Sequence, residues 1–281
     1  MNGKTLKTTL AQGNPIFGIA LEGYGQPRWP RFFNQIGLDF VFLDSEHTPQ
    51  NRETIAWAVQ AYAANHIAPL LRIPEASPTL AAMGLDAGAH GIIVPYVETV
   101  EQVKAVVGAV KYRPLKGQAL TEAVESGHFP NEETRQYLTE YNQDTVLVIM
   151  IESPAGVANL DELLSIAGVD AVLMGPHDLS VSHGVPEQYD HPIFLEAAQQ
   201  VIATSKTHGV GVGMHYTTEA LGGLIQWLDW GCNFICQHSD TLYIARGAIK
   251  ELDRLHAYST DSATDKPDDS SPDLGAAGHA T

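Results

Sequence analysis

Residues 40–47 read FVFLDSEH, in which four apolar residues are followed at once by two carboxylates, a hydroxyl and an imidazole. A strand that is apolar at every position is buried on both faces, as in a parallel sheet covered by helices. Functional groups usually gather at the carboxyl ends of such strands in a barrel. The stretch therefore predicts a buried parallel strand that ends in a candidate site.

Seven other apolar runs have the same character, and a segment with the apolar spacing of a helix follows each of them. These runs are residues 16–21, 68–73, 91–97, 145–151, 171–175, 211–216 and 234–237. Many of the helical segments end in glycine just before the next run, as helix C-caps do. Eight strand–helix repeats over about 255 residues predict an α/β fold of the (β/α)8 TIM barrel type, for which about 250 residues are typical. A doubly wound sheet fits less well, because no glycine-rich phosphate turn follows the first run.

Two segments fall outside this repeat. Residues 111–144 form a long insertion between the fourth and fifth strands, and long connections at the top of a barrel are often lids or oligomer contacts. Residues 259–281 are rich in Ser, Asp, Pro and Gly, which predicts a disordered acidic tail. We therefore expect one barrel domain at residues 1–258.

The composition narrows the class of partner and the compartment. The formal charge of −17 disfavours binding to nucleic acids and to anionic membranes, which such a surface repels. Cys232 and Cys236 have no second ligand pair, so we expect buried thiols rather than a zinc site. The amino-terminal sequence lacks the apolar core of a signal peptide, and no apolar run is long enough to cross a bilayer. These features predict a cytoplasmic protein.

Ionisable residues stand in or after four of the predicted strands. Asp44 and His47 follow the second strand, Arg72 lies within the third, Glu152 ends the fifth and Asp178 follows the sixth. Because the carboxyl ends of barrel strands meet at one face, we expect these side chains to share a pocket. The two carboxylates on neighbouring strands suit Mg²⁺ or Mn²⁺, but Glu152 could equally form a buried ion pair with Arg72. His47 is either a capping histidine or a general base whose tautomer Asp44 fixes.

Several catalytic schemes are disfavoured by residues that the chain lacks. None of the eight lysines lies in a predicted strand, so a Schiff-base lysine in the barrel is not expected. No His-x-His pair occurs, which disfavours a zinc hydrolase. A glycine-rich phosphate cradle does not follow the last two strands, so we expect a small unphosphorylated anion as substrate.

Taken in order, these motifs resemble those of the metal-dependent class II 2-keto acid aldolases. The motifs are D-x-E-H after the second strand, Arg in the third, VP in the fourth, IE at the end of the fifth and GPxDLS after the sixth. The family contains 4-hydroxy-2-oxoheptanedioate and 2-keto-3-deoxy-sugar-acid aldolases of the phosphoenolpyruvate/pyruvate barrel superfamily, and the likeness covers roughly residues 5–256. It implies retro-aldol cleavage of a 4-hydroxy-2-keto acid to pyruvate and an aldehyde through a metal-stabilised enolate.

The resemblance also implies a role for each of the ionisable residues. Glu152 and Asp178 match the carboxylates that bind the divalent ion, which would be Mg²⁺, Mn²⁺ or Co²⁺. Arg72 matches the arginine that contacts the keto oxygen of pyruvate. His47, with Asp44 behind it, matches the base that removes the hydroxyl proton.

The resemblance also assigns a role to the turn after the sixth strand, and the chain departs from the family pattern at three places. Backbone N–H groups around Gly175, His177 and Asp178 would hold the pyruvate carboxylate. Met150 stands where family members usually carry Gln, and His177 replaces a usually small residue. Residues 116–123 replace an Arg-Gly segment. We expect these departures to alter the surroundings of the metal and of the aldehyde.

The resemblance further implies a homo-oligomer, either a hexamer built as a trimer of dimers or a trimer. In it the last helix, residues 240–255, packs on a neighbouring subunit, although a helix that closes its own barrel fits the sequence equally well.

Two other functions remain open. One is an oxaloacetate decarboxylase or condensing enzyme on the same metal-enolate site, and the other is a barrel that binds a ligand without turnover, which Met150 and residues 116–123 suggest.

Overall fold

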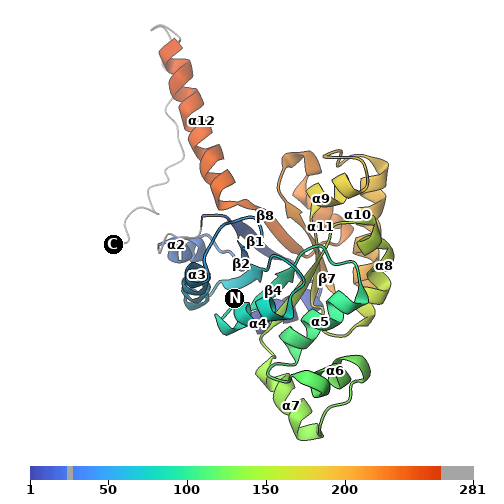
Figure 1. The fold of residues 1–281 in the computed structure, drawn as a ribbon. Helices are drawn as coiled ribbons and strands as arrows, with labels where there is room; N and C mark the ends of the chain where they lie inside the picture. The colour runs from blue at the N-terminus through green and yellow to red at the C-terminus, as the bar shows by residue number, and fades with distance from the viewer. Residues whose placement is uncertain (24–27, 261–281) are drawn as a thin grey trace.

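Eight parallel strands close into a single barrel in the computed structural model, which describes residues 1–23 and 28–260 (Figure 1). Neighbouring strands follow the order of the chain, and β8 pairs with β1 to close the ring. The strands are β1 Ile16–Leu21, β2 Phe40–Asp44, β3 Ala68–Arg72, β4 Gly91–Val94, β5 Val146–Ile151, β6 Ala171–Met174, β7 Gly211–Tyr216 and β8 Phe234–Ser239. The predicted (β/α)8 barrel is thus confirmed, and every predicted apolar run overlaps a strand.

Helices follow the strands, and most of them form the outer wall of the barrel. They are α1 Gly3–Ala11, α2 Trp29–Gln35, α3 Arg52–Ala64, α4 Pro78–Asp86, α5 Val100–Lys111, α6 Gly117–Ser126, α7 Glu132–Tyr141, α8 Pro154–Ser165, α9 Pro176–Ser182, α10 Pro192–Thr207, α11 Leu224–Trp230 and α12 Asp240–Thr260. Six of them follow an N-cap residue whose side chain accepts the N–H group three residues on, and these caps are Asn2, Asn51, Ser77, Thr99, Asn131 and Ser153. The cap at Ser153 starts α8 directly after Glu152, and this fixes where the fifth strand ends.

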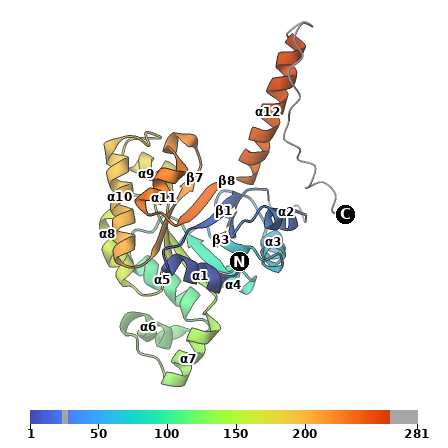
Figure 2. The same cartoon turned by 180° about the vertical axis from the view of Figure 1, so that it is seen from behind.

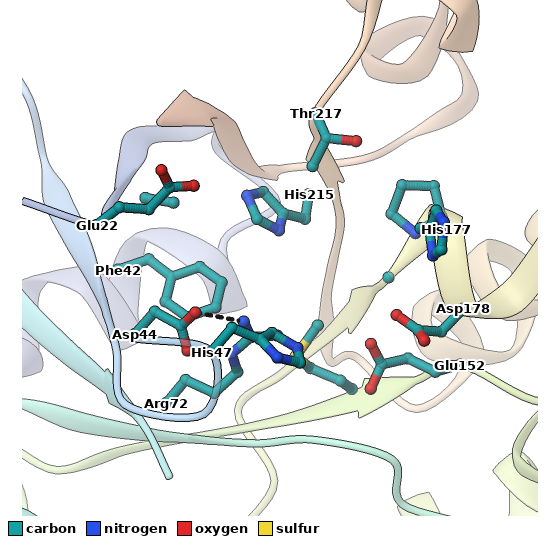
Figure 3. A pocket seen from close by; sticks show the side chains of 14 residues that line it. Glu22, Phe42, Asp44, His47, Arg72, Glu152, His177, Asp178, His215 and Thr217 are labelled. Carbon is teal, nitrogen blue, oxygen red and sulfur yellow. Dashed lines mark hydrogen bonds and ion pairs between the residues drawn. The ribbon is translucent and has the colours of Figure 1, made fainter. Parts of the chain in front are cut away.

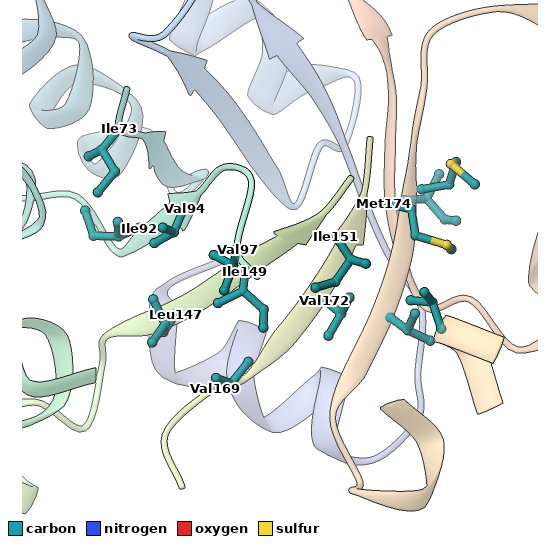
Figure 4. Packing of buried hydrophobic residues seen from close by; sticks show 14 of the residues in the cluster. Ile73, Ile92, Val94, Val97, Leu147, Ile149, Ile151, Val169, Val172 and Met174 are labelled. Atoms are coloured by element: carbon teal, nitrogen blue, oxygen red, sulfur yellow. The ribbon is translucent and has the colours of Figure 1, made fainter. Parts of the chain in front are cut away.

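The strands contribute side chains to two hydrophobic cores, one inside the barrel and one between strands and helices, because successive side chains alternate between the two sides. On β2, Phe40 and Phe42 belong to the interior cluster, whereas Val41 packs in the layer between strands and helices. Figure 4 shows this outer layer around β5 and β6. From α1, Leu6 and Leu10 are fully buried in the interior cluster and close the barrel floor. Strands with two buried faces require the continuous apolar runs found in the sequence.

Residues 111–144 do not form a lid over the barrel mouth. They fold largely into α6 and α7, which lie beyond the end of α5 at the amino-terminal end of the barrel (Figures 1 and 2). The lid expectation was wrong because α5 already returns the chain from the carboxyl ends of the strands to their amino ends. An oligomer contact by this segment stays a prediction. Residues 116–123 therefore contribute to α6, where Leu120 and Val124 lie beside Gly108 of α5, and not to the barrel mouth.

The chain leaves the barrel through α12, a helix that projects away from the other elements (Figures 1 and 2). It does not lie along its own barrel, and it continues through Thr260, past the predicted boundary at residue 258. The remainder of the predicted tail, residues 261–281, lies outside the described residues.

Cys232 and Cys236 are free and buried, as predicted. Within residues 1–23 and 28–260, no helix combines the length and the apolar character needed to cross a membrane.

Candidate active site

A cavity of about 270 Å³ opens among the carboxyl ends of the barrel strands. It is lined by all seven residues that the sequence predicted for the site: Asp44, His47, Arg72, Glu152, Gly175, His177 and Asp178. Figure 3 shows Glu152 and Asp178 facing each other, with His47 and Arg72 beside them. Barrel closure thus brings together residues from four strands that are widely separated in the chain.

Arg72 ends β3 and lies beside Asp44, the last residue of β2, in the strand register. Its Nε and Nη2 donate to the two carboxylate oxygens of Asp44 at 2.8 and 2.7 Å, and its Nη1 lies 3.1 Å from Oε2 of Glu46. Burial disfavours charge on Asp44, but the hydrogen bonds and the positive charge of Arg72, with the N–H of Glu46, together outweigh this effect and lower the Asp44 pKa. The alternative ion pair between Arg72 and Glu152 is not formed by these described side chains.

Glu152 follows β5 directly, and its carboxylate is almost fully buried. Its Oε2 accepts a hydrogen bond of 2.8 Å from the N–H of Tyr96, a residue with a left-handed backbone φ of 49°. Burial, with a smaller contribution from Asp178, raises the pKa of Glu152 to about 7. Burial is therefore the main factor that disfavours the charged form of this carboxylate.

The turn from β6 into α9 supplies the other half of the carboxylate pair. Asp178 lies in the first turn of α9 and faces Glu152 (Figure 3). A Cβ at Gly175 would stand 2.1 Å from Oε1 of Glu152, so only glycine leaves room for this carboxylate. The pairing of β5 with β6 sets the two acidic groups side by side.

His47 lies exposed at the rim of the cavity. Its Nε2 is 3.6 Å from Oε2 of Glu46, whereas the Asp44 carboxylate binds Arg72. Burial raises the pKa of Glu46, although Arg72 and His47 oppose the shift. In this structure Glu46, rather than Asp44, is thus placed to orient the imidazole.

Sequence reasoning missed several residues of the site. Glu22, His215 and Thr217 also line the cavity, and Glu46 contacts Arg72 behind it. His215 is an ionisable residue inside an apolar strand. The same feature identified Arg72 in the sequence, and it could have identified His215. Burial lowers the pKa of His215 to about 4, so its ring is neutral near pH 7. Glu22 and Thr217 carry no such signal, because they are ordinary polar residues after their strands.

Comparison with known proteins identifies the family. The sequence pattern of the HpcH/HpaI aldolase/citrate lyase family matches residues 26–236. The chain belongs to this family. It is 32% identical over 231 residues to a 2-keto-3-deoxy-L-rhamnonate aldolase of Klebsiella pneumoniae, covering 81% of this chain and 83% of that one. It is 29% identical over 252 residues to a hydroxypyruvate/pyruvate aldolase of Roseovarius nubinhibens, covering 88% and 95%.

A solved structure supports the same assignment. An HpcH/HpaI aldolase from Desulfitobacterium hafniense matches with a TM-score of 0.77 and 25% identity, over 89% of this chain and 96% of that one. The predicted resemblance is therefore confirmed. As a member of the HpcH/HpaI family, the protein is a carbon–carbon lyase of the aldolase class.

The HpcH/HpaI family depends on a divalent metal ion, and the carboxylate pair fits one. Among the described residues, no group of three or more His, Cys, Asp or Glu side chains is placed to hold a metal. Two carboxylates nevertheless suffice for a hard cation such as Mg²⁺, which usually keeps substrate and water oxygens as its remaining ligands. A cation between Glu152 and Asp178 would also favour the charged form of Glu152, which burial and, to a smaller extent, Asp178 disfavour.

Proposed function

We propose that this aldolase cleaves a 4-hydroxy-2-keto acid into pyruvate and an aldehyde with the help of a divalent ion. The observation that supports this most strongly is the pair of Glu152 and Asp178, which face each other beside Arg72 in one cavity. The two carboxylates would hold Mg²⁺, Mn²⁺ or Co²⁺. When bound, the ion supplies positive charge that stabilises the negative charge developing on the keto oxygen.

Arg72 and the turn after β6 bind the pyruvate half of the substrate. Asp44 accepts two hydrogen bonds from the guanidinium of Arg72. These bonds keep the positive charge of Arg72 fixed near the keto oxygen. Asp44 thus acts as a positioning residue. The N–H groups around Gly175, His177 and Asp178 hold the pyruvate carboxylate.

His47 moves the proton at the aldehyde half, directly or through one water. In cleavage it takes the proton from the C4 hydroxyl, and the electrons of that O–H bond form the aldehyde carbonyl. The C3–C4 bond breaks, its electrons pass to the enolate of pyruvate, and protonation at C3 completes the product. Glu46, with Oε2 at 3.6 Å from Nε2 of His47, stabilises the protonated imidazole.

Replacing Glu152 tests the metal assignment. We expect Glu152→Gln to lower metal-stimulated pyruvate release from a 4-hydroxy-2-keto acid by about a thousandfold, because Lewis-acid stabilisation amounts to several kcal/mol. Glu162→Gln, on the exposed face of α8, is the matched control and should behave like the wild type. Pyruvate release is measured over a Mg²⁺ or Mn²⁺ titration. A Glu152→Gln variant with the metal dependence of the wild type would refute the assignment.

The same site would stabilise the enolate that oxaloacetate forms, so both substrate classes are assayed side by side. Release of pyruvate from the hydroxy-keto acid supports the aldolase. Activity on oxaloacetate alone would favour a decarboxylase or condensing enzyme. Binding of metal and pyruvate without turnover of either substrate would favour a ligand-binding barrel.

We further propose that α12 binds another copy of this chain. Its Ile249, Leu252 and Leu255 are exposed and lie three residues apart on one face. An apolar groove of about 630 Å³ lies between α2 and the start of α12, with Phe32 and Ile36 among its lining. Exposed apolar surface of this kind is typical of an interface. We propose a hexamer built as a trimer of dimers, or a trimer, in the cytoplasm, where two free thiols remain reduced.

A further inference from the structure

The chain leaves β4 through a segment that is bound to the end of β5. The N–H group of Tyr96 donates to Oε2 of Glu152 at 2.8 Å, and the N–H group of Val97 donates to the carbonyl oxygen of Met150 at 3.1 Å. Successive N–H groups of a regular strand point to opposite sides, so the backbone must leave strand geometry for both groups to face β5. It does so at Tyr96, whose backbone φ is 49°.

Tyrosine is an unusual residue at such a left-handed position. A residue with a Cβ is disfavoured there, and glycine is the usual residue where the chain must turn in this way. Strained residues persist where the surrounding contacts hold them, and they are concentrated at active sites. The tyrosine at this position therefore indicates that its side chain makes a contact that glycine could not supply.

The hydroxyl group of Tyr96 reaches the helix that carries the other carboxylate of the pair. Its Oη lies 3.0 Å from Oγ of Ser182, so that one hydroxyl donates to the other. Ser182 is the last residue of α9, a helix of seven residues whose first turn contains Asp178. Tyr96 is not among the described residues that line the cavity. From outside the site, it thus binds Glu152 through its N–H group and α9 through its side chain.

The carboxylate of Glu152 is fixed at both of its oxygens. Oε2 accepts the N–H group of Tyr96, and Oε1 lies in the space that Gly175 leaves open. Each carboxylate oxygen has a second lone pair, so a hydrogen bond at Oε2 leaves the group able to bind a cation. Carboxylates that bind metal ions are commonly held by hydrogen bonds of this kind.

We propose that Tyr96 is a positioning residue that sets the separation of Glu152 and Asp178 for the divalent ion. The proposal rests on the aldolase function above, in which this pair holds the ion. When both are charged, the two facing carboxylates repel each other, so they form a tight site only if both are held in place (Figure 3). Tyr96 holds Glu152 directly and holds α9 through Ser182, and loss of its hydroxyl lets Asp178 move away.

Binding of Mn²⁺ alone to the metal-free protein tests this role. Electron paramagnetic resonance measures the free Mn²⁺ during a titration without substrate, so the result does not depend on turnover. Tyr96→Phe removes only the hydroxyl, and we expect the Kd for Mn²⁺ to rise about tenfold, as is usual when a residue that orients a metal ligand is lost. Tyr137→Phe, at an exposed position of α7, is the matched control and should keep the wild-type Kd. A Tyr96→Phe protein with the wild-type Kd would overturn the proposal.

The partner hydroxyl provides a second and independent variant. Ser182→Ala should raise the Kd for Mn²⁺ by the same factor, and the double variant should bind no more weakly than either single variant, because both changes remove one contact. Effects that multiply in the double variant would show that the two hydroxyls do not act through each other, which contradicts the proposal. Ser126→Ala, at an exposed position of α6, is the matched control. Urea unfolding of each variant establishes that the chain is folded in the assay, so a changed Kd reports positioning.

The same titration of Glu152→Gln separates this proposal from the function on which it rests. We expect Glu152→Gln to lose Mn²⁺ binding, because a neutral amide replaces one of two charged ligands. That loss, together with wild-type binding by Tyr96→Phe, would overturn only the role of Tyr96. Wild-type binding by Glu152→Gln would overturn the metal site, and with it the role of Tyr96.

Discussion

The guanidinium of Arg72 is held on two sides by carboxylates. Asp44 binds Nε and Nη2, and Oε2 of Glu46 lies 3.1 Å from Nη1. A planar group fixed in this way keeps its charge in one direction before substrate arrives, so little reorganisation is needed during the reaction. The same contacts make the pair important for stability, because loss of one partner leaves a buried charge without compensation.

We predict that Asp44→Asn weakens both activity and stability. The variant should lower kcat/KM for pyruvate release by about a hundredfold, because the guanidinium loses its fixed position. It should also lower the free energy of unfolding by about 3 kcal/mol, the usual cost of breaking a buried ion pair from one side. Steady-state kinetics and urea unfolding measure the two effects.

The control for Asp44→Asn is Asp161→Asn, which removes the partner of His208 at an exposed site. Surface ion pairs contribute little, so this variant should match the wild type in both measurements. An Asp44→Asn enzyme with wild-type kinetics would show that Arg72 does not need this carboxylate for catalysis.

Individual residues differ in how far the sequence reveals them. Arg72 and His215 stand out because an ionisable side chain inside an apolar strand needs a reason to be there. Glu22 does not stand out, since polar residues follow most of the strands. It lines both the site cavity and a neighbouring cavity of about 450 Å³. Its place between the two cavities depends on the pairing of β8 with β1, which brings residues of both chain ends together.

At the scale of elements, the junction of β8 with α12 ties the barrel mouth to the projecting helix. Asp240 begins α12 and is buried. Its carboxylate accepts the N–H of Glu22 at 2.9 Å and the N–H of Gly23 at 3.1 Å. One side chain thus fixes the segment after β1, and with it the position of Glu22 in both cavities.

We predict that Asp240→Ala loosens this segment. Amide hydrogen exchange at Glu22 and Gly23 should become about tenfold faster, because two hydrogen bonds to a buried carboxylate are lost. Mass spectrometry of the peptide that contains both amides measures the rate. Asp253→Ala, at an exposed position of the same helix, should leave that rate unchanged. Equal exchange in Asp240→Ala and wild type would show that other contacts hold the segment.

The elements themselves were largely predictable. Each strand buries two faces, so its sequence is apolar throughout and its ends are visible in the composition. The sequence showed that residues 111–144 are a long insertion between two strands, but it did not show at which end of the barrel the insertion lies. Which end of a barrel an insertion occupies depends on whether a helix has already returned the chain, and the boundary between α5 and α6 decides this.

At the scale of the whole molecule, α12 carries exposed apolar residues away from the barrel (Figure 1). We predict that a variant with Leu252→Glu and Leu255→Glu forms a smaller species than the wild type, because charges on this face oppose its burial. Light scattering during size-exclusion chromatography measures the mass. Lys250→Glu, on the opposite face of α12, should keep the wild-type mass. A wild-type enzyme that runs as a monomer would contradict the proposed oligomer.

The sequence by itself determined the eight strands, the barrel and the strand ends at which Asp44, Arg72, Glu152 and Asp178 gather. These features follow from local patterns of burial, which appear in the sequence as apolar runs and the polar residues that end them. The tertiary structure alone decided that Arg72 binds Asp44 and Glu46, that the insertion lies away from the mouth, and that a second cavity adjoins the site. Those features depend on strand register and on closure of the ring, which bring together residues that no local pattern connects.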